Sequence, residues 1–154
     1  MADPAKAKLN RVDSLMRVRK TQLEIEAGML ARIHNEIAAQ QQVLVKHQNE
    51  YIRGVNDLNA LRQKTDLSQL PVMESGLDLV KLKWYRVLKT LRDLQSMADA
   101  QRAQVMVARR NLKTVETLEE RYLNQSRQYQ DRIEQKHMDE VGLRSYLNKS
   151  NGNS

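Results

Sequence analysis

The side chains that could carry catalysis or hold a metal are dispersed along this sequence. The three histidines, His34, His47 and His137, lie far apart, and none has a second ligand at the short spacing of a zinc site. The carboxylates are scattered along helix-forming stretches, where no concave pocket would gather a pair for acid–base chemistry. The Gly-Lys-Ser/Thr sequence of a phosphate-binding loop does not occur. We therefore expect a protein that is not an enzyme and that uses no metal or other cofactor.

A basic stretch between residues 81 and 113 could hold nucleic acid through its phosphates. Its members are Lys81, Lys83, Arg86, Lys89, Arg92, Arg102, Arg109, Arg110 and Lys113. On a helix these charges are spread around the axis, and no platform of aromatic residues accompanies them, which favours a solvated surface or a protein partner. A basic coiled-coil protein that dimerises or binds nucleic acid is the alternative interpretation.

Two groups of four residues have the spacing that places side chains on one face of a helix, because both step by four, three and four residues. We name them together the turn-proximal face: Gln40, Leu44, His47 and Tyr51, then Trp84, Leu88, Leu91 and Gln95. Leu44, Tyr51, Trp84 and Leu91 also fit simple core packing. An apolar stripe wider than a two-helix contact needs, however, predicts that another protein docks here.

The turn that brings these groups together is predicted at residues 65–76. Pro71 stands there with Asp66, Ser68 and Gly76 nearby, whereas the sequence on either side favours helix. Proline lacks the amide hydrogen that a helix interior uses, and it disfavours helix at the residue before it. We expect helices at residues 5–64 and 77–147, with Gly142 and a disordered tail at 148–154 marking the end.

Both predicted helices carry apolar residues at seven-residue intervals, which is typical of a supercoiled pair. The first has Leu9, Met16, Leu23, Leu30, Ile37, Leu44, Tyr51 and Leu58, with a more polar companion row three residues further on. The second has the rows Leu77, Trp84, Leu91, Ala98, Val105, Leu112 and Val80, Val87, Leu94, Gln101, Ala108, Val115, Tyr122, Tyr129. Folding about residue 70 would place residues 132–140 beside the first ten residues.

Composition agrees with an all-α protein that has a narrow core. The 154 residues carry a net charge of +7, contain no cysteine or phenylalanine, and are only 4% aromatic. Helix-forming residues dominate, and few of them could fill a thick globular core. The sequence therefore predicts a single antiparallel coiled-coil hairpin of two long helices over residues 1–147, as a monomer. No apolar run approaches the roughly 20 residues needed to cross a bilayer.

Residues 132–140 resemble the C-terminal signature of the FliJ family of flagellar type III export proteins. The family pattern there is Arg, two residues, Gln-Lys, one residue, Met-Asp-Glu, and this sequence has Arg132, Gln135-Lys136 and Met138-Asp139-Glu140. Residues 48–51 and 112–121 resemble further segments of the family. We call residues 132–140 the signature segment.

The resemblance implies a non-enzymatic central stalk and adaptor of the flagellar export apparatus, with a fold similar to the stalk subunit of rotary ATPases. It implies binding to the hexameric export ATPase FliI, to the membrane export gate protein FlhA and to export chaperones. It also implies a cytoplasmic protein at the inner face of the cell membrane. Residues for the ATPase would be Arg132, Gln135, Lys136, Met138, Asp139 and Glu140, and the turn-proximal face would bind the gate, with His47 where a tyrosine is common.

Overall fold

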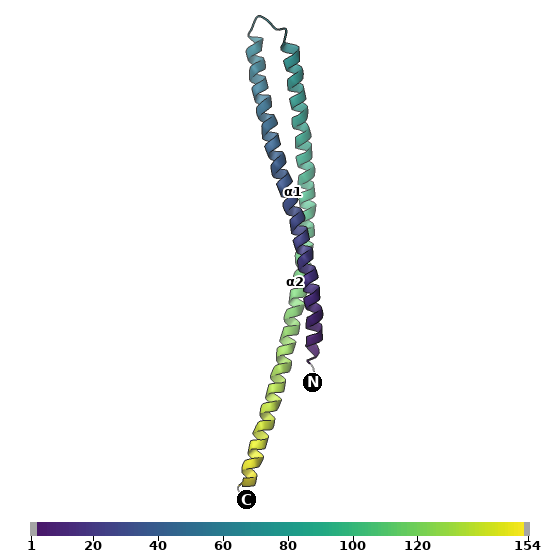
Figure 1. Ribbon diagram of the computed structural model, residues 1–154, viewed down its shortest axis with the longest axis vertical. Coiled ribbons are helices and arrows are strands. Elements are labelled where there is room, and N and C mark those ends of the chain that lie inside the picture. Colours follow the sequence, from purple (N-terminus) through teal and green to yellow (C-terminus); the bar gives the residue numbers. More distant parts are fainter. Residues whose placement is uncertain (1–2, 153–154) are drawn as a thin grey trace. The chain divides into compact units, whose positions relative to one another are not determined.

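The computed structural model describes residues 3–152, which form two long helices and the loop that joins them (Figure 1). Helix α1 spans Pro4–Arg62 and has 59 residues. Helix α2 spans Leu70–Gly152 and has 83 residues. The two pack against each other as an antiparallel hairpin, which confirms the all-α fold predicted from the seven-residue repeats.

Each helix buries the strip of residues that its repeat predicts. In α1 the partly or fully buried positions include 9, 12, 16, 19, 23, 26, 30 and 33, so they alternate steps of three and four. In α2 they include 77, 80, 84, 87, 91, 94, 98 and 101. We call these two strips the seam. The steps average 3.5 residues, which keeps the strip facing a neighbouring helix over many turns.

The contacts divide the chain into two compact units, each of which contains a part of both helices. The first unit comprises Met1–Glu24 and Val107–Ser154, and the second is Ile25–Met106. In the first, Val12, Met16 and Val115 form a buried cluster, against which Leu112 and Tyr122 also pack. In the second, the buried apolar residues are Leu58, Val87, Leu91, Ala98 and Val105.

The connection between the helices is shorter than predicted, because α2 begins at Leu70 and not at residue 77. Pro71 lies in the first turn of α2, where a backbone N–H has no partner within the helix and its absence costs nothing. In the loop, the Ser68 N–H donates to Asp66 Oδ1 at 3.0 Å. This backbone hydrogen bond, aided by the Ser68 side chain, lowers the pKa of the Asp66 carboxyl below its usual value.

The predicted helix ends also differ from the observed ones. Helix α1 ends at Arg62 and starts at Pro4, where Asp3 caps it by accepting the Ala5 N–H at 2.9 Å. Helix α2 runs through Gly142 and through residues 148–152 of the predicted tail, while 153–154 lie outside the described residues. No described glycine has the positive φ of a helix-capping glycine, so Gly142 does not end the helix.

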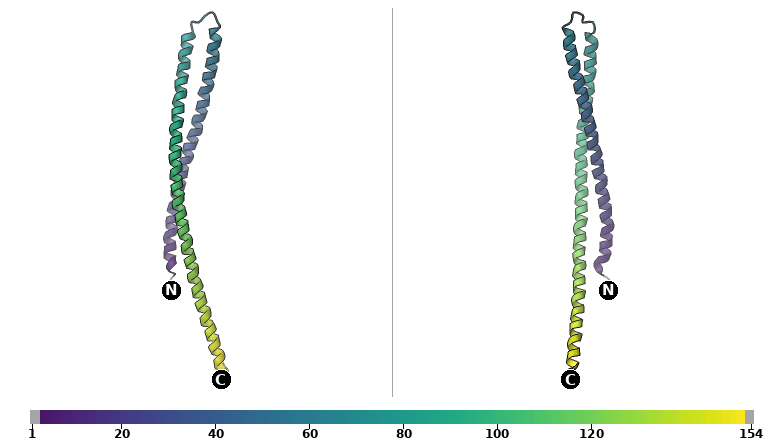
Figure 2. Two further views of the ribbon diagram at one scale, coloured as in Figure 1. Left: turned by 180° about the vertical axis from the view of Figure 1, so that it is seen from behind. Right: turned by 60° about the vertical axis from the view of Figure 1, so that its left-hand side comes forward.

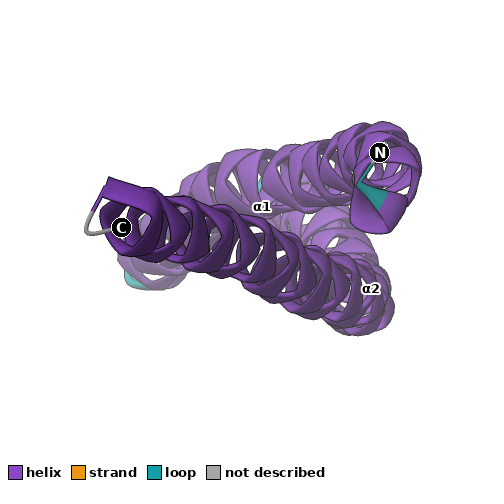
Figure 3. Cartoon of the chain, turned by 90° about the horizontal axis from the view of Figure 1, so that it is seen from below, coloured by secondary structure: helices purple, strands orange, loops and turns teal. Residues whose placement is uncertain are grey.

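Helix α2 continues past the N-terminal end of α1 in both views of Figure 2. Coloured by secondary structure and seen from below, the described chain consists of helix and loop only (Figure 3). Within residues 3–152, neither helix has a segment that is both long and apolar enough to cross a membrane.

Two helix glycines of the second unit provide a test of the seam. Nothing lies within 4 Å of where a Cβ on Gly28 would be, whereas a Cβ on Gly54 would be 2.6 Å from Leu77 Cδ2. We expect Gly28→Ala to raise the free energy of unfolding by about 0.5–1 kcal/mol through helix propensity alone. Gly54→Ala should raise it less or lower it, because Leu77 must move. Urea unfolding measures both, and an equal stabilisation would contradict the packing described here.

Candidate functional site

The α1 half of the turn-proximal face lies in the seam of the second unit. Gln40, Leu44, His47 and Tyr51 are all partly buried, at the three- and four-residue steps that face α2. The polar pair turns toward neighbours on its own helix: Gln40 Nε2 donates to Glu36 Oε1 at 3.2 Å, and His47 Nδ1 lies 3.4 Å from Glu50 Oε2. These four side chains therefore contribute to helix pairing and expose only their edges to solvent.

The α2 half of this face is divided between the seam and its flank. Leu91 is 8% exposed, and Trp84 is half-buried with its ring centroid 5.7 Å from that of Tyr51. Leu88 is partly buried one position outside the seam, and Gln95 is exposed. Six of the eight predicted residues thus hold the helices together, and only Leu88 and Gln95 lie on the flank.

Beside the flank, the structure places two residues of α1 that spacing did not assign to the site, His34 and Ile37. Gln95 lines a groove of about 380 Å³ with His34 and Ile37 of α1 and with Ala98, Asp99 and Arg102 of α2. His34 and Ile37 could have been found from the sequence, because Ile37 belongs to the apolar row and His34 follows a seam position directly. Its lining therefore combines two apolar side chains with four polar ones.

Tyr85 is an exposed aromatic residue within the basic stretch. It is 56% exposed and stacks on Trp84, with ring centroids 6.4 Å apart and planes 9° from parallel. The surrounding basic side chains at 81, 83, 86, 89 and 92 are all exposed. A single accessible ring is still fewer than the row of aromatics on which successive bases stack.

The N-terminal end of α1 lies beside residues 122–126 of α2, not beside residues 132–140 as predicted. The Ser126 hydroxyl donates to the Asp3 carboxylate, and the Lys8 ammonium lies 5.5 Å from the centroid of the Tyr122 ring. The predicted pairing is wrong because α2 begins seven residues early, which shifts the alignment of the helices.

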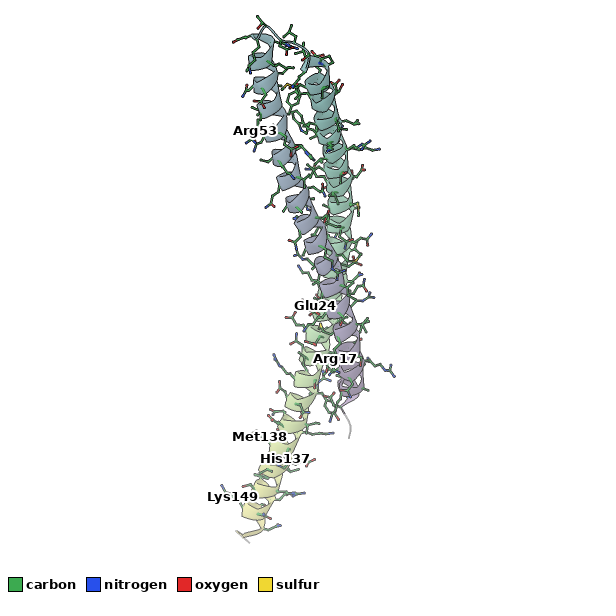
Figure 4. The ribbon with its side chains drawn as sticks, turned by 45° about the horizontal axis from the view of Figure 1, so that its top comes forward. Arg17, Glu24, Arg53, His137, Met138 and Lys149 are labelled. Carbon is green, nitrogen blue, oxygen red and sulfur yellow. The ribbon has the colours of Figure 1, made fainter. Side chains whose placement is uncertain are left out.

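Residues 130–152 of α2, which we call the overhang, extend beyond α1, and every one of them is exposed. His137, Met138 and Lys149 lie on this part of the helix in Figure 4, where no other helix runs beside them. The overhang contains all six residues predicted to bind the ATPase: Arg132, Gln135, Lys136, Met138, Asp139 and Glu140. Gln135 Nε2 donates to Asp139 Oδ1 at 3.2 Å, which links two of them along one side.

Metal-binding or catalytic geometry does not arise from these surfaces. Among residues 3–152, no group of three His, Cys, Asp or Glu side chains could hold a metal ion. The carboxylate that lies near His47 is that of Glu50, with Nδ1 and Oε2 3.4 Å apart.

Comparison with known protein families gives a match over nearly the whole chain. A model of the family described as flagellar FliJ protein matches residues 8–151. The chain belongs to the FliJ family. The match includes the signature segment and most of the overhang. No curated protein matches the chain in the corresponding search, and no solved structure does.

Membership of the FliJ family identifies the chain as a component of the flagellar export apparatus. FliJ proteins are non-catalytic stalk or adaptor proteins, and the chain is therefore not an enzyme. This agrees with the resemblance carried by residues 132–140.

The ring contacts of Trp84 lead to a prediction about stability. Trp84→Ala removes the contact with Tyr51 in the seam, and we expect it to lower the free energy of unfolding by about 1–3 kcal/mol. Tyr85→Ala, on the exposed side of the same helix turn, is the matched control and should change it by no more than about 0.5 kcal/mol. Thermal unfolding followed by circular dichroism measures both, and equal losses would place Trp84 outside the seam.

Proposed function

We propose that this FliJ-family protein is the stalk and adaptor of the export machinery, and that it binds the export ATPase ring through the overhang. The observation that carries this proposal is the exposure of the entire signature segment on an unaccompanied helix. An exposed single helix needs a partner, because helices gain most of their stability from packing. The export gate protein and export chaperones are the further partners, bound elsewhere on the chain.

The distribution of the signature residues around the helix supports insertion into a ring. At 100° per residue, Arg132, Lys136, Glu140 and the other three predicted contacts cover roughly 200° of the circumference. A helix that docks on one flat surface would use a stripe about half as wide. A ring of subunits can contact several sides of a helix at once, which fits the wider distribution.

For the gate protein, we propose the flank that carries Leu88 and Gln95, together with the groove beside His34. Leu88 provides apolar area next to the seam, and Gln95 provides hydrogen-bonding groups at the rim. The seam members of the turn-proximal face hold this flank in place. Binding to a membrane gate would locate the protein in the cytoplasm, at the inner face of the cell membrane.

Deleting residues 130–154 tests the ATPase contact. Because every described residue removed is exposed, we expect circular dichroism to show two paired helices with little change in unfolding temperature. The same protein should lose binding to the export ATPase hexamer and any effect on its rate of ATP hydrolysis. Titration of the hexamer with wild-type and truncated protein provides the measurement.

A triple variant locates the contact more sharply. Gln135→Ala, Lys136→Ala and Asp139→Ala together should weaken binding to the ATPase by about tenfold or more. The matched control is Arg144→Ala, Ser145→Ala and Lys149→Ala, which removes side chains from the same overhang outside the signature. The proposed contact between the overhang and the ATPase would be refuted if the truncated protein still changed the rate of ATP hydrolysis as wild type does. It would also be refuted if the two triple variants lost the same amount of ATPase affinity.

The gate flank has its own test. We expect Leu88→Ala with Gln95→Ala to weaken binding to the gate protein by about tenfold while the unfolding temperature stays close to wild type. Leu82→Ala is the control, because Leu82 is also exposed on α2 but points away from this flank. Surface-immobilised gate protein gives the affinities. If Leu82→Ala weakens binding instead, the gate contacts the outer, basic side of α2.

A further inference from the structure

The overhang continues the seam although α1 does not accompany it. Ile133, Glu140 and Leu147 extend one row of α2, and Lys136 and Leu143 extend the other, at the same seven-residue interval. Ile133 is 44% exposed, Leu143 60% and Leu147 50%. A heptad row beyond the end of its partner helix is a surface on which another helix can pack by the same knobs-into-holes contacts.

These rows are symmetric about Met138. If a second, identical overhang lies antiparallel with Met138 opposite Met138, Ile133 faces Leu143 of the second copy. Lys136 then faces Glu140 of the second copy, and Leu147 faces the aromatic ring of Tyr129 of the second copy. Each apolar residue meets an apolar one, and the basic residue meets the acidic one, which is the pairing that specifies a partner in coiled coils.

We propose that a second copy of this chain docks antiparallel on the overhang, centred on Met138, to form a reversible dimer. The paired segment has equal charge of both signs: four basic residues at 132, 136, 144 and 149, and four acidic residues at 131, 134, 139 and 140. The whole chain carries +7, whereas this segment is neutral, so two copies can approach here without net repulsion between their paired segments.

The position of α1 agrees with the same alignment independently. Asp3 lies at the level of Ser126, because their side chains hydrogen-bond. A dimer centred on Met138 places Ser150 of the second copy opposite Ser126, so its α2 ends where α1 begins. The second copy fills the part of the seam that α1 leaves uncovered, and the C-terminal helix end meets the N-terminal end of α1 with favourable dipoles.

A different alignment loses these matches. Sliding the second copy by one heptad places Lys136 against Leu147 and Glu140 against Leu143, which buries two charges against apolar side chains. About three heptads of contact make a weak dimer. Asp139 lies one residue from the centre of the pairing, close to Asp139 of the second copy, and the two like charges weaken the dimer further. The monomer predicted from the sequence therefore dominates when the protein is dilute.

The dimer covers Lys136 and Glu140, which the proposed function assigns to the ATPase. Dimer and ATPase complex then exclude each other, so that self-association would store the protein away from the ATPase. This consequence depends on the proposed function, whereas the dimer itself does not.

Charge reversal tests the pairing in the full chain. By sedimentation equilibrium, we expect wild type to self-associate at high micromolar concentration, and Lys136→Glu or Glu140→Lys each to weaken the dimer by about tenfold, since each change creates two like-charge contacts. The double variant Lys136→Glu, Glu140→Lys should restore it. Circular dichroism checks that helix content is the same in all four proteins.

Cysteine cross-linking tests the alignment, because the chain has no cysteine of its own. A mixture of Ile133→Cys and Leu143→Cys proteins should form a disulfide-linked dimer readily, and a mixture of Ile133→Cys and Leu147→Cys proteins should not. Three results would overturn the proposal. They are a wild-type protein that stays monomeric at every concentration, a double charge variant that dimerises as weakly as the single variants, and equal cross-linking in both mixtures. Failure of ATPase binding alone would leave the dimer intact and refute only the proposed function.

Discussion

Two helices can cover only one strip of each other, and this limit governs the rest of the structure. The most buried side chains are small, with Ala98 at 2%, Ala5 at 3% and Val12 at 4% exposed, and among the described residues no large side chain is fully buried. Larger residues such as Trp84 and Tyr51 reach past the strip and leave their edges in solvent. Stability is therefore spread over many partly buried contacts, and there is no thick core in which a catalytic pocket could be desolvated.

Polar residues within the seam act on alignment more than on stability. Gln101 Nε2 donates to the Glu26 backbone oxygen at 3.0 Å and also to the Glu26 carboxylate, within the second unit. In the first unit, Ser126 and Asp3 form the corresponding link. Apolar rows with a seven-residue repeat pack almost equally well after a shift of seven residues, whereas a displaced Gln101 would leave polar groups buried without partners. These links favour one alignment over its neighbours.

The unequal lengths of the helices connect the fold to the function proposed for it. Helix α1 has 59 residues and α2 has 83, and α1 begins beside Ser126, so the signature segment of the FliJ family stands clear of the hairpin. Its residues take no part in helix pairing. In the turn-proximal face, by contrast, the side chains that would contact a partner also pack between the two helices. Mutations in the overhang therefore separate partner binding from stability better than a mutation of Trp84 does, and the exposed heptad rows of the overhang are the basis of the proposed dimer.

The sequence alone determined the two helices, the seam positions and the family, because amphipathic periodicity and a short signature are local properties of the chain. It did not determine where α2 begins, since Pro71 is compatible with a turn and with the first turn of a helix. The alignment of the helices followed from that choice, so residues 132–140 were wrongly expected beside α1. Spacing also could not separate a seam residue such as His47 from an exposed residue on the flank such as Gln95. Periodicity reports only that a helix face is apolar, and the tertiary structure decides whether the chain's own second helix covers it.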